Sequence, residues 1–161
     1  MMVKYAALVS CAFLAACSAG TPMQPVSPVL REVPADLVSQ GFGASMRELR
    51  LSQGLAGMAQ DPNLTRAAQA HADDMAQNNY FSHVAPNGPN GITLEQRIAS
   101  VGCQPRVMAE NISKGQQSEE EVFAAWAASP AHRANMLGVR FRSYGLGHSG
   151  DIWVLKLADQ C

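Results

Sequence analysis

The chain has 161 residues, of which 47% are hydrophobic and only 16% are charged. This composition is typical of one folded domain and excludes a chain that is disordered throughout. The formal net charge of −1 gives no basic field that would attract a phosphate backbone, so nucleic acid is not an expected partner.

The first 16 residues have the pattern of a signal peptide. Lys4 gives a short positive region, and the apolar run from Tyr5 to Ala16 is too short to span a bilayer. Residues Leu14 to Cys17 resemble a bacterial lipobox, in which the cysteine is lipidated and becomes the mature N-terminus. We therefore expect a lipid anchor on Cys17 that binds the membrane. The alternative is an ordinary secretory signal in which Cys17 has no special role.

The segment after the cysteine predicts a cellular location and a tether. Ser18 resembles outer-membrane lipoproteins more than those retained at the inner membrane. The expected location is the bacterial cell envelope, with the protein anchored in the outer membrane and facing the periplasm. Residues 17–39 contain four prolines among small polar residues, which is typical of an extended tether. Residues 40–161 are the expected domain.

Two cysteines remain once the leader and the anchor are set aside, Cys103 and Cys161. An even pair in an exported protein is typical of a disulfide, because the compartment is oxidising. We expect the bond Cys103–Cys161, which would join the end of the chain to the middle of the domain. Two free thiols are the alternative.

Several stretches of the domain have the pattern of a helix. The clearest opens with Asp61 as N-cap and Pro62 at the first helical position, followed by apolar residues at helical spacing. Thr93 and Gln96 are spaced as a capping box for another helix. Helices are expected over residues 43–55, 62–79 and 94–101, from Ser118 to Ser129, and from Pro130 to Met136.

The strand patterns are shorter and lie later in the chain. Residues 107–113 are apolar, and residues 142–147 and 152–158 flank a turn at Ser149 and Gly150. Three or four short strands with about four helices suggest an α+β sandwich.

His71 lies on the apolar stripe of the helix expected over residues 62–79. It can be a ligand to a functional site, or a neutral core histidine with one hydrogen-bond partner. We favour the core histidine, because a single imidazole on an apolar face is most often of that kind.

His83, Glu110 and His132 each stand beside apolar residues and are the candidates for a shared site. Two imidazoles and a carboxylate can bind Zn²⁺, perform acid–base chemistry, or form a polar network that shapes a binding surface. The wide spacing of these three residues along the chain does not indicate which of these roles they have. Ser149 lacks the final glycine of a nucleophile elbow and falls in a hairpin turn, so we do not expect a nucleophilic serine.

Three segments resemble the CAP superfamily, also called the SCP-like domain. They are Phe81 to His83, Ala109 to Ile112, and Trp126 to Leu137. Residues 144–147 and 153–154 are similar to the bacterial branch of the family. The family includes cysteine-rich secretory proteins, insect venom antigen 5 and plant pathogenesis-related proteins. The resemblance covers residues 44–161, and so nearly the whole expected domain.

The resemblance implies an α+β fold, a three-layer α-β-α sandwich with a small antiparallel sheet. It also implies a cleft with two histidines and two acidic residues. His83 and His132 match the histidines and Glu110 matches one acid, whereas Ser129 stands where the second acid falls in members that have it. This pattern permits zinc as a cofactor, held by His83 and His132 with Glu110 nearby. The site would have one carboxylate fewer than the two that the full family pattern contains.

The resemblance implies no common reaction. Members are linked to lipid or sterol binding, to signalling and to defence, and sometimes to protease activity, so fold alone does not give a reaction. We expect a non-enzymatic envelope module that binds a lipid, a wall fragment or a protein partner through His83, Glu110, His132 and Ser129. The alternative is a metal-dependent or acid–base hydrolase of envelope peptide or polymer, in which Glu110 activates water.

Overall fold

The computed structural model describes residues 41–161. The expected leader, the lipid attachment at Cys17 and the tether lie outside the described residues. Within residues 41–161, no helix is both long enough and apolar enough to cross a bilayer.

Five helices and four strands follow one another along this part of the chain, which confirms the α+β class. They are α1 (Phe42–Leu51), β1 (Ala59–Gln60), α2 (Pro62–Gln77), α3 (Leu94–Ala99), β2 (Met108–Lys114), α4 (Glu119–Ala128), α5 (Pro130–Met136), β3 (Ser143–Ser149) and β4 (Ile152–Ala158). The first three helices end earlier than expected, because their last turns open into tight C-terminal turns.

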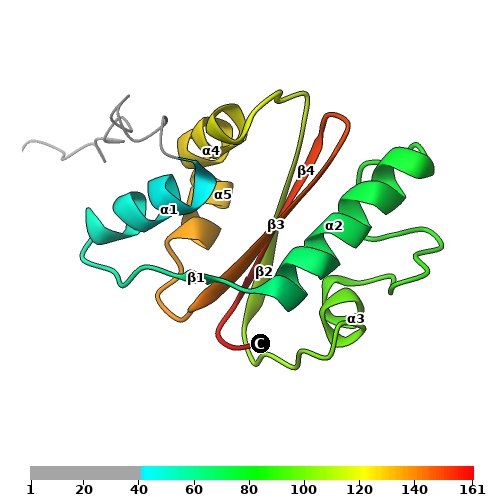
Figure 1. Cartoon of the computed structure of the whole chain (residues 1–161), viewed down its shortest axis with the longest axis horizontal. Coiled ribbons are helices and arrows are strands. Elements are labelled where there is room, and N and C mark those ends of the chain that lie inside the picture. The colour runs from blue at the N-terminus through cyan, green and yellow to red at the C-terminus, as the bar shows by residue number, and fades with distance from the viewer. Residues whose placement is uncertain (1–40) are drawn as a thin grey trace, which may run out of the picture.

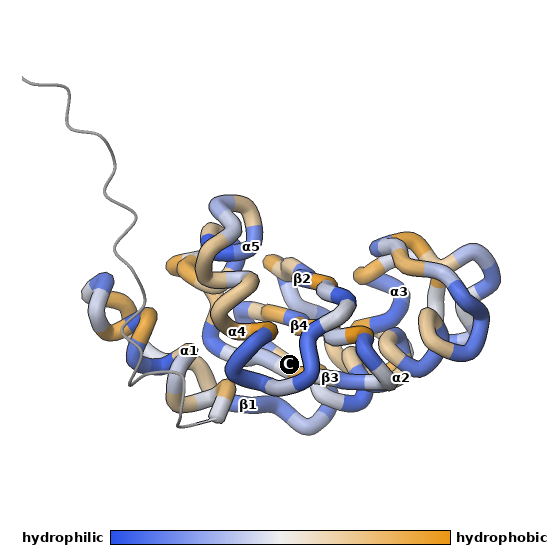
Figure 2. Tube along the Cα trace, turned by 90° about the horizontal axis from the view of Figure 1, so that it is seen from above, coloured by the Kyte–Doolittle hydropathy of each residue, from blue (hydrophilic) through white to orange (hydrophobic). Residues whose placement is uncertain are grey.

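The sheet lies between two layers of helices (Figures 1 and 2). Helices α1, α4 and α5 cover one face, and α2 and α3 cover the other. The strand order is β1-β3-β4-β2, so β2 is an edge strand. Strands β2, β4 and β3 are antiparallel as expected, but β1 pairs in parallel with β3. The expected antiparallel sheet is therefore mixed, and the two residues of β1 are too few to show any periodicity in the sequence.

Strand β4 is buried on both faces, and its side chains alternate between the two layers. Trp153 and Leu155 belong to the core with α1 and α4, whereas Val154 packs against α2. Lys156 shares the face of Val154 and is completely buried. In the register of the sheet it stands directly opposite Glu110 of β2.

Two glycines of β3 let α2 lie close to the sheet. A Cβ added at Gly145 would overlap the backbone of α2 at Leu64, and one at Gly147 would overlap it at Ala68. No larger residue fits at these positions unless the helix moves. Small residues therefore set the distance between α2 and the sheet.

The predicted helix caps are in place. The side chain of Asp61 accepts hydrogen bonds from the backbone N–H groups of Asn63 and Leu64, at 2.8 and 3.0 Å. Thr93 and Gln96 form a complete capping box at the start of α3. These caps satisfy N–H groups that have no partner inside the helix, which is why the helix starts could be predicted well.

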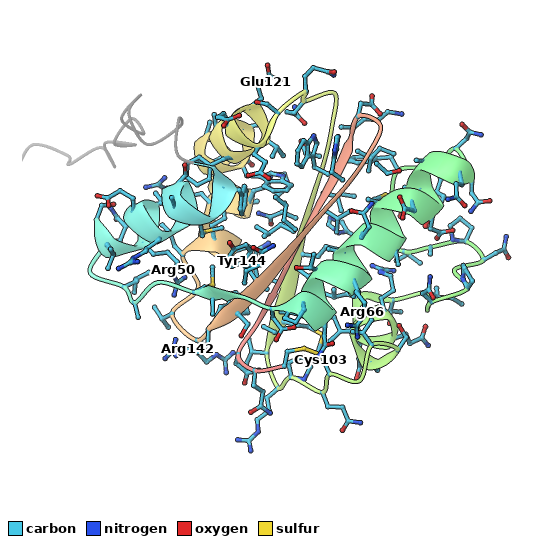
Figure 3. All side chains as sticks on the ribbon, in the orientation of Figure 1. Arg50, Arg66, Cys103, Glu121, Arg142 and Tyr144 are labelled. Carbon is cyan, nitrogen blue, oxygen red and sulfur yellow. A yellow bond between two sulfur atoms is a disulfide. The ribbon has the colours of Figure 1, made fainter. Side chains whose placement is uncertain are left out.

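The predicted disulfide Cys103–Cys161 is present, with the two Cα atoms 4.8 Å apart. It joins the last residue of the chain to the loop that follows α3 (Figure 3). Cys103 is buried in a small cluster with Leu64, Ile98 and Ala158, so the bond closes the α2–α3 side of the domain.

Candidate functional site

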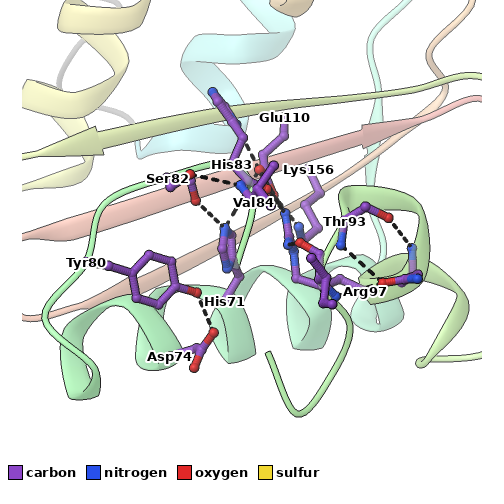
Figure 4. A network of polar contacts seen from close by, with 12 residues as sticks. His71, Asp74, Tyr80, Ser82, His83, Val84, Thr93, Arg97, Glu110 and Lys156 are labelled. Atoms are coloured by element: carbon purple, nitrogen blue, oxygen red, sulfur yellow. Dashed lines mark hydrogen bonds and ion pairs between the residues drawn. The ribbon is translucent and has the colours of Figure 1, made fainter. Parts of the chain in front are cut away.

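Glu110 is the centre of a buried polar network at the edge strand β2 (Figure 4). Its side chain is only 2% exposed, and Nη2 of Arg97 in α3 lies 3.2 and 3.3 Å from its two oxygens. Lys156 of β4 pairs with Oε2. His83 lies on the segment between α2 and α3, and its Nδ1 is 2.9 Å from Oε1. One carboxylate thus binds two buried cations and one imidazole.

These contacts decide the charges of the network. Burial alone would raise the pKa of Glu110, but the hydrogen bond from His83 and the charges of Lys156 and Arg97 outweigh it and lower the pKa to about 2. Burial lowers the pKa of Lys156 to about 8, although Glu110 opposes this change. At neutral pH, Glu110 is therefore an anion between two cations.

Arg97 also holds the segment that carries His83. Its Nη2 donates to the backbone oxygen of His83, and its Nη1 donates to that of Ile92, both at 2.8 Å. Arg97 therefore fixes both the main chain of His83 and the carboxylate to which the ring of His83 is bound.

The imidazole of His83 is the part of this network that reaches the surface. Its side chain is 55% exposed. Because Nδ1 faces Glu110, the other ring nitrogen, Nε2, is the one available to a ligand. Phe81 and Val84, on either side along the chain, are 46% and 57% exposed, so the imidazole stands among accessible apolar side chains.

His132 approaches from the opposite helix layer. It lies in the first turn of α5, and its backbone oxygen accepts a hydrogen bond from Nδ2 of Asn111 at 3.1 Å. Oδ1 of Asn111 accepts another from Nδ2 of Asn135 at 2.8 Å. These amides hold α5 against β2. Burial, and then the charge of His83, lower the pKa of His132.

Ser129 is the N-cap residue of α5, three positions before His132, and is half-buried. Its side chain makes no capping hydrogen bond, and Pro130 at the first helical position starts the helix instead. The serine therefore does not serve as a side-chain cap.

The structure confirms His71 as a neutral core histidine. It is 1% exposed, and burial lowers its pKa to about 4. Its Nε2 lies 3.1 Å from the backbone oxygen of Ser82, its one hydrogen-bond partner, and 3.8 Å from Oε1 of Glu110. His71 therefore forms an inner wall of the network and does not reach a ligand.

Arg97 and Lys156 are the residues of this network that the sequence analysis missed. Lys156 interrupts the otherwise apolar run from Ile152 to Ala158, and a lysine buried in a strand needs an anion. That pattern could have paired it with Glu110. Arg97 offers no such indication, since a basic residue in the last turn of a helix is ordinary on a surface.

A three-ligand metal site is not preformed at these residues. In residues 41–161, the one group of three metal-ligating side chains whose atoms lie within 4.8 Å of one another is Asp61, Cys103 and Cys161. Its two cysteines are joined as a disulfide and offer no thiolate. The two histidines and Glu110 do not form such a group.

Comparison with known proteins agrees with the fold. The model of the Cysteine-rich secretory protein family, CAP, matches residues 45–152. YkwD, an uncharacterised protein of Bacillus subtilis (strain 168), is 38% identical over 106 residues, which is 65% of this chain and 40% of the relative. The membrane protein YlbC of the same organism is 28% identical over 99 residues, 62% of this chain and 28% of that protein. The chain therefore spans less than half the length of these relatives.

Solved structures show the same architecture. An extracellular protein of Bacillus anthracis str. Ames that contains an SCP domain has a TM-score of 0.68 and 25% identity, over 84% of this chain and 44% of that one. An outer surface protein of Borrelia burgdorferi has a TM-score of 0.63 and 21% identity, over 73% and 89% of the two chains. The family model, the relatives and the shared three-layer architecture lead to one conclusion: this chain belongs to the cysteine-rich secretory protein family, CAP.

Proposed function

We propose that this protein is an envelope module that binds a ligand, without catalysis, on the surface around His83 and His132. The observation that carries the proposal is the state of Glu110. Its carboxylate is 2% exposed and is bound by Arg97, Lys156 and His83. Glu110 therefore orients the imidazole of His83, and the imidazole is the group that meets the ligand.

The same observation argues against a hydrolase. A general base works best when its pKa lies near the operating pH, and the pKa of Glu110 is about 2. Its oxygens are also turned toward buried cations and away from solvent. Glu110 is thus a weak base in a place that substrate water would not easily reach.

The apolar side chains near His83 favour a lipid over the other two ligand classes. Phe81, Val84 and Ile92 are large and exposed, and all three lie on the segment between α2 and α3. Exposed apolar groups around a polar centre are typical of a site for an amphipathic ligand. In this proposal His132 and Ser129 complete the surface from the side of α5.

Zinc fits the two histidines of the proposed surface, His83 and His132. A zinc-bound histidine commonly donates its other ring N–H to a carboxylate, and His83 has that arrangement with Glu110. His83 and His132 would hold the ion, which would supply Lewis-acid chemistry when bound. A third protein ligand is missing from this set, so zinc is a ligand of the proposed surface and no hydrolytic step is derived from it.

The envelope location rests on sequence and on the names of relatives. Cys17 in its lipobox-like context supports a lipid anchor, and Ser18 supports the outer membrane. Relatives of the same fold are described as extracellular or as outer surface proteins. The lipid anchor would place the binding surface near membrane lipid.

The test is calorimetric titration of the full chain with a short-chain phospholipid below its critical micelle concentration. Soluble wall fragments and zinc chloride are separate titrants. We expect phospholipid binding that is lost in His83→Ala and in His132→Ala. The matched control is His148→Ala, which removes an exposed imidazole on the β3–β4 hairpin. Equal phospholipid binding by all four proteins, or turnover of the wall fragments that is lost in His83→Ala, would overturn the proposal.

A further inference from the structure

Asp74 of α2 is a second buried carboxylate, and its partners differ from those of Glu110. The residue is 9% exposed. Its Oδ1 accepts a hydrogen bond from Nδ2 of Asn78 at 2.7 Å, and its Oδ2 accepts one from the hydroxyl of Tyr80. Both donors are neutral. No ion pair among residues 41–161 includes Asp74, whereas Glu110 takes part in every one of them.

The end of α2 is built so that Tyr80 folds back over this carboxylate. Asn79 has a left-handed backbone conformation, with φ of 53°. The N–H of Tyr80 bonds to the carbonyl of Met75 at 3.1 Å, and that of Asn78 bonds to the carbonyl of Asp74 at 3.0 Å. This turn closes the helix and reverses the chain. Burial, and then the hydrogen bond to Asp74, raise the pKa of Tyr80, so its hydroxyl remains a donor.

A cavity of about 250 Å³ opens beside this carboxylate. It is lined by Asp74, Asn78, Tyr80, Pro86 and Asn87. The last two belong to the turn after the His83 segment, and a hydrogen bond of 2.9 Å from the N–H of Ala85 to the carbonyl of Ile92 closes the base of that turn. The cavity therefore has one anionic group, an aromatic ring, a proline ring and two amides in its wall.

The hydrogen bonds of Asp74 leave room for a cation. A carboxylate offers about four acceptor positions, and Asn78 and Tyr80 occupy two of them. A buried charge is costly unless it is paired. Asp74 is not part of any group of three metal-ligating side chains in residues 41–161, so the missing partner is better matched by an N–H donor than by a metal ion.

We propose that this cavity binds the primary ammonium group of an organic ligand, with Asp74 as its counter-ion. The ring of Tyr80 forms a wall with which a cation interacts favourably, and the side-chain oxygens of Asn78 and Asn87 can accept further N–H bonds. The site is distinct from the His83 surface, because the ring of His71 lies between Tyr80 and Glu110 (Figure 4).

The test compares n-butylammonium with its uncharged analogue n-butanol, each titrated into the ¹⁵N-labelled full chain. We expect n-butylammonium to shift the backbone amide resonances of Asn78, Tyr80 and Asn87 with saturation, and n-butanol to leave them in place. This comparison uses the unaltered protein and so does not depend on how any variant folds. Equal shifts with the two probes, or ammonium shifts confined to the acidic first turn of α4, would overturn the proposal.

Two variants of adjacent residues sharpen the result. Asp74→Asn removes the charge and should weaken n-butylammonium binding by about tenfold or more, which is the effect of losing one charged hydrogen bond. Asp73→Asn removes a carboxylate from the preceding position of the same helix. Asp73 lines a different hollow with Arg66 and Asn90, so this variant should bind n-butylammonium as the parent does. A folded Asp74→Asn chain that binds with unchanged affinity would contradict the assignment.

Discussion

The two helix layers of this domain are built from different chemistry. On the face covered by α1, α4 and α5, the ring of Phe42 packs edge-on against Phe123 and Trp126, with ring centroids 5.8 Å apart in both pairs. On the face covered by α2, alanines replace aromatic rings, and the buried side chains include Glu110 and Lys156. The layer of α1, α4 and α5 therefore stabilises the domain mainly by apolar burial, whereas the layer of α2 and α3 holds the buried charges of the site.

The aromatic layer also contains a buried charge, that of Arg50, but its partners differ from those of Glu110. Arg50 of α1 is 1% exposed and donates to the backbone carbonyls of Ala56, Met136 and Gly138, at 2.8, 2.8 and 3.0 Å. It therefore joins α1 to the end of α5 and to the loops that follow α1 and α5 (Figure 3). Arg50 is bound by backbone carbonyls, whereas Glu110 is bound by the exposed imidazole of His83. Of these two buried charges, only Glu110 is therefore connected to a side chain at the surface.

The largest expected effect is in the aromatic layer. Phe123→Ala should lower the free energy of unfolding by about 4 kcal/mol, because it leaves a cavity among rings that cannot collapse. Urea denaturation at neutral pH measures this. Phe81→Ala removes the same ring from a position that is 46% exposed, and should change the free energy by less than about 0.5 kcal/mol. Similar losses in both would mean that the aromatic layer is loosely packed.

Breaking the buried charge network comes next. Glu110→Gln removes the anion that Arg97 and Lys156 share, and should lower the free energy of unfolding by about 3 kcal/mol. Glu95→Gln changes an exposed carboxylate of α3 and should have little effect. A Glu110→Gln chain as stable as the parent would show that water or a changed protonation state compensates the two cations.

Acid should reveal the same interaction without a mutation. The pKa of Glu110 in the folded chain is about 2, below the ordinary value of 4.5, so its stabilising effect is present above pH 4.5 and is lost as the pH falls toward 2. At about 1.4 kcal/mol per pKa unit, the loss is about 3 kcal/mol. The difference in stability between the parent and Glu110→Gln, measured from pH 6 to pH 2, should shrink by that amount. A constant difference would refute the lowered pKa.

The smallest effect tests the close approach of α2. Gly147→Ala should cost about 2 kcal/mol, because the added methyl group forces α2 away from β3. Gly57→Ala is the matched control, since its Cβ would meet only the flexible side chain of Arg47 at 3.3 Å. Thermal unfolding of the two variants gives the comparison. Equal melting temperatures would show that α2 can move away from the sheet without loss.

The sequence predicted most of the secondary structure because the helix starts have local chemical causes. Asp61 and Thr93 cap their helices as expected. Strand β1 was missed because a two-residue strand depends on its partner: the N–H of Asp61 bonds to the carbonyl of Tyr144 at 2.8 Å. Such a long-range pairing leaves no local pattern. His83 and Glu110 were expected to share a site, and the structure shows that they are in direct contact. The part of Arg97 was not expected, because only the folded chain brings α3 next to Glu110 of β2.

The meeting of two layers at the edge strand β2 has a thermodynamic consequence. His83 is held from the α2–α3 layer through Arg97, and His132 from the α5 layer through Asn111. A ligand that contacts both imidazoles spans the joint between the layers and binds only when both are assembled. By linkage, such a ligand raises the unfolding temperature, and the rise grows with the logarithm of the ligand concentration once this exceeds the dissociation constant, although the ligand touches neither hydrophobic core. The melting curve of the domain can therefore serve as a binding assay for ligands whose identity is unknown.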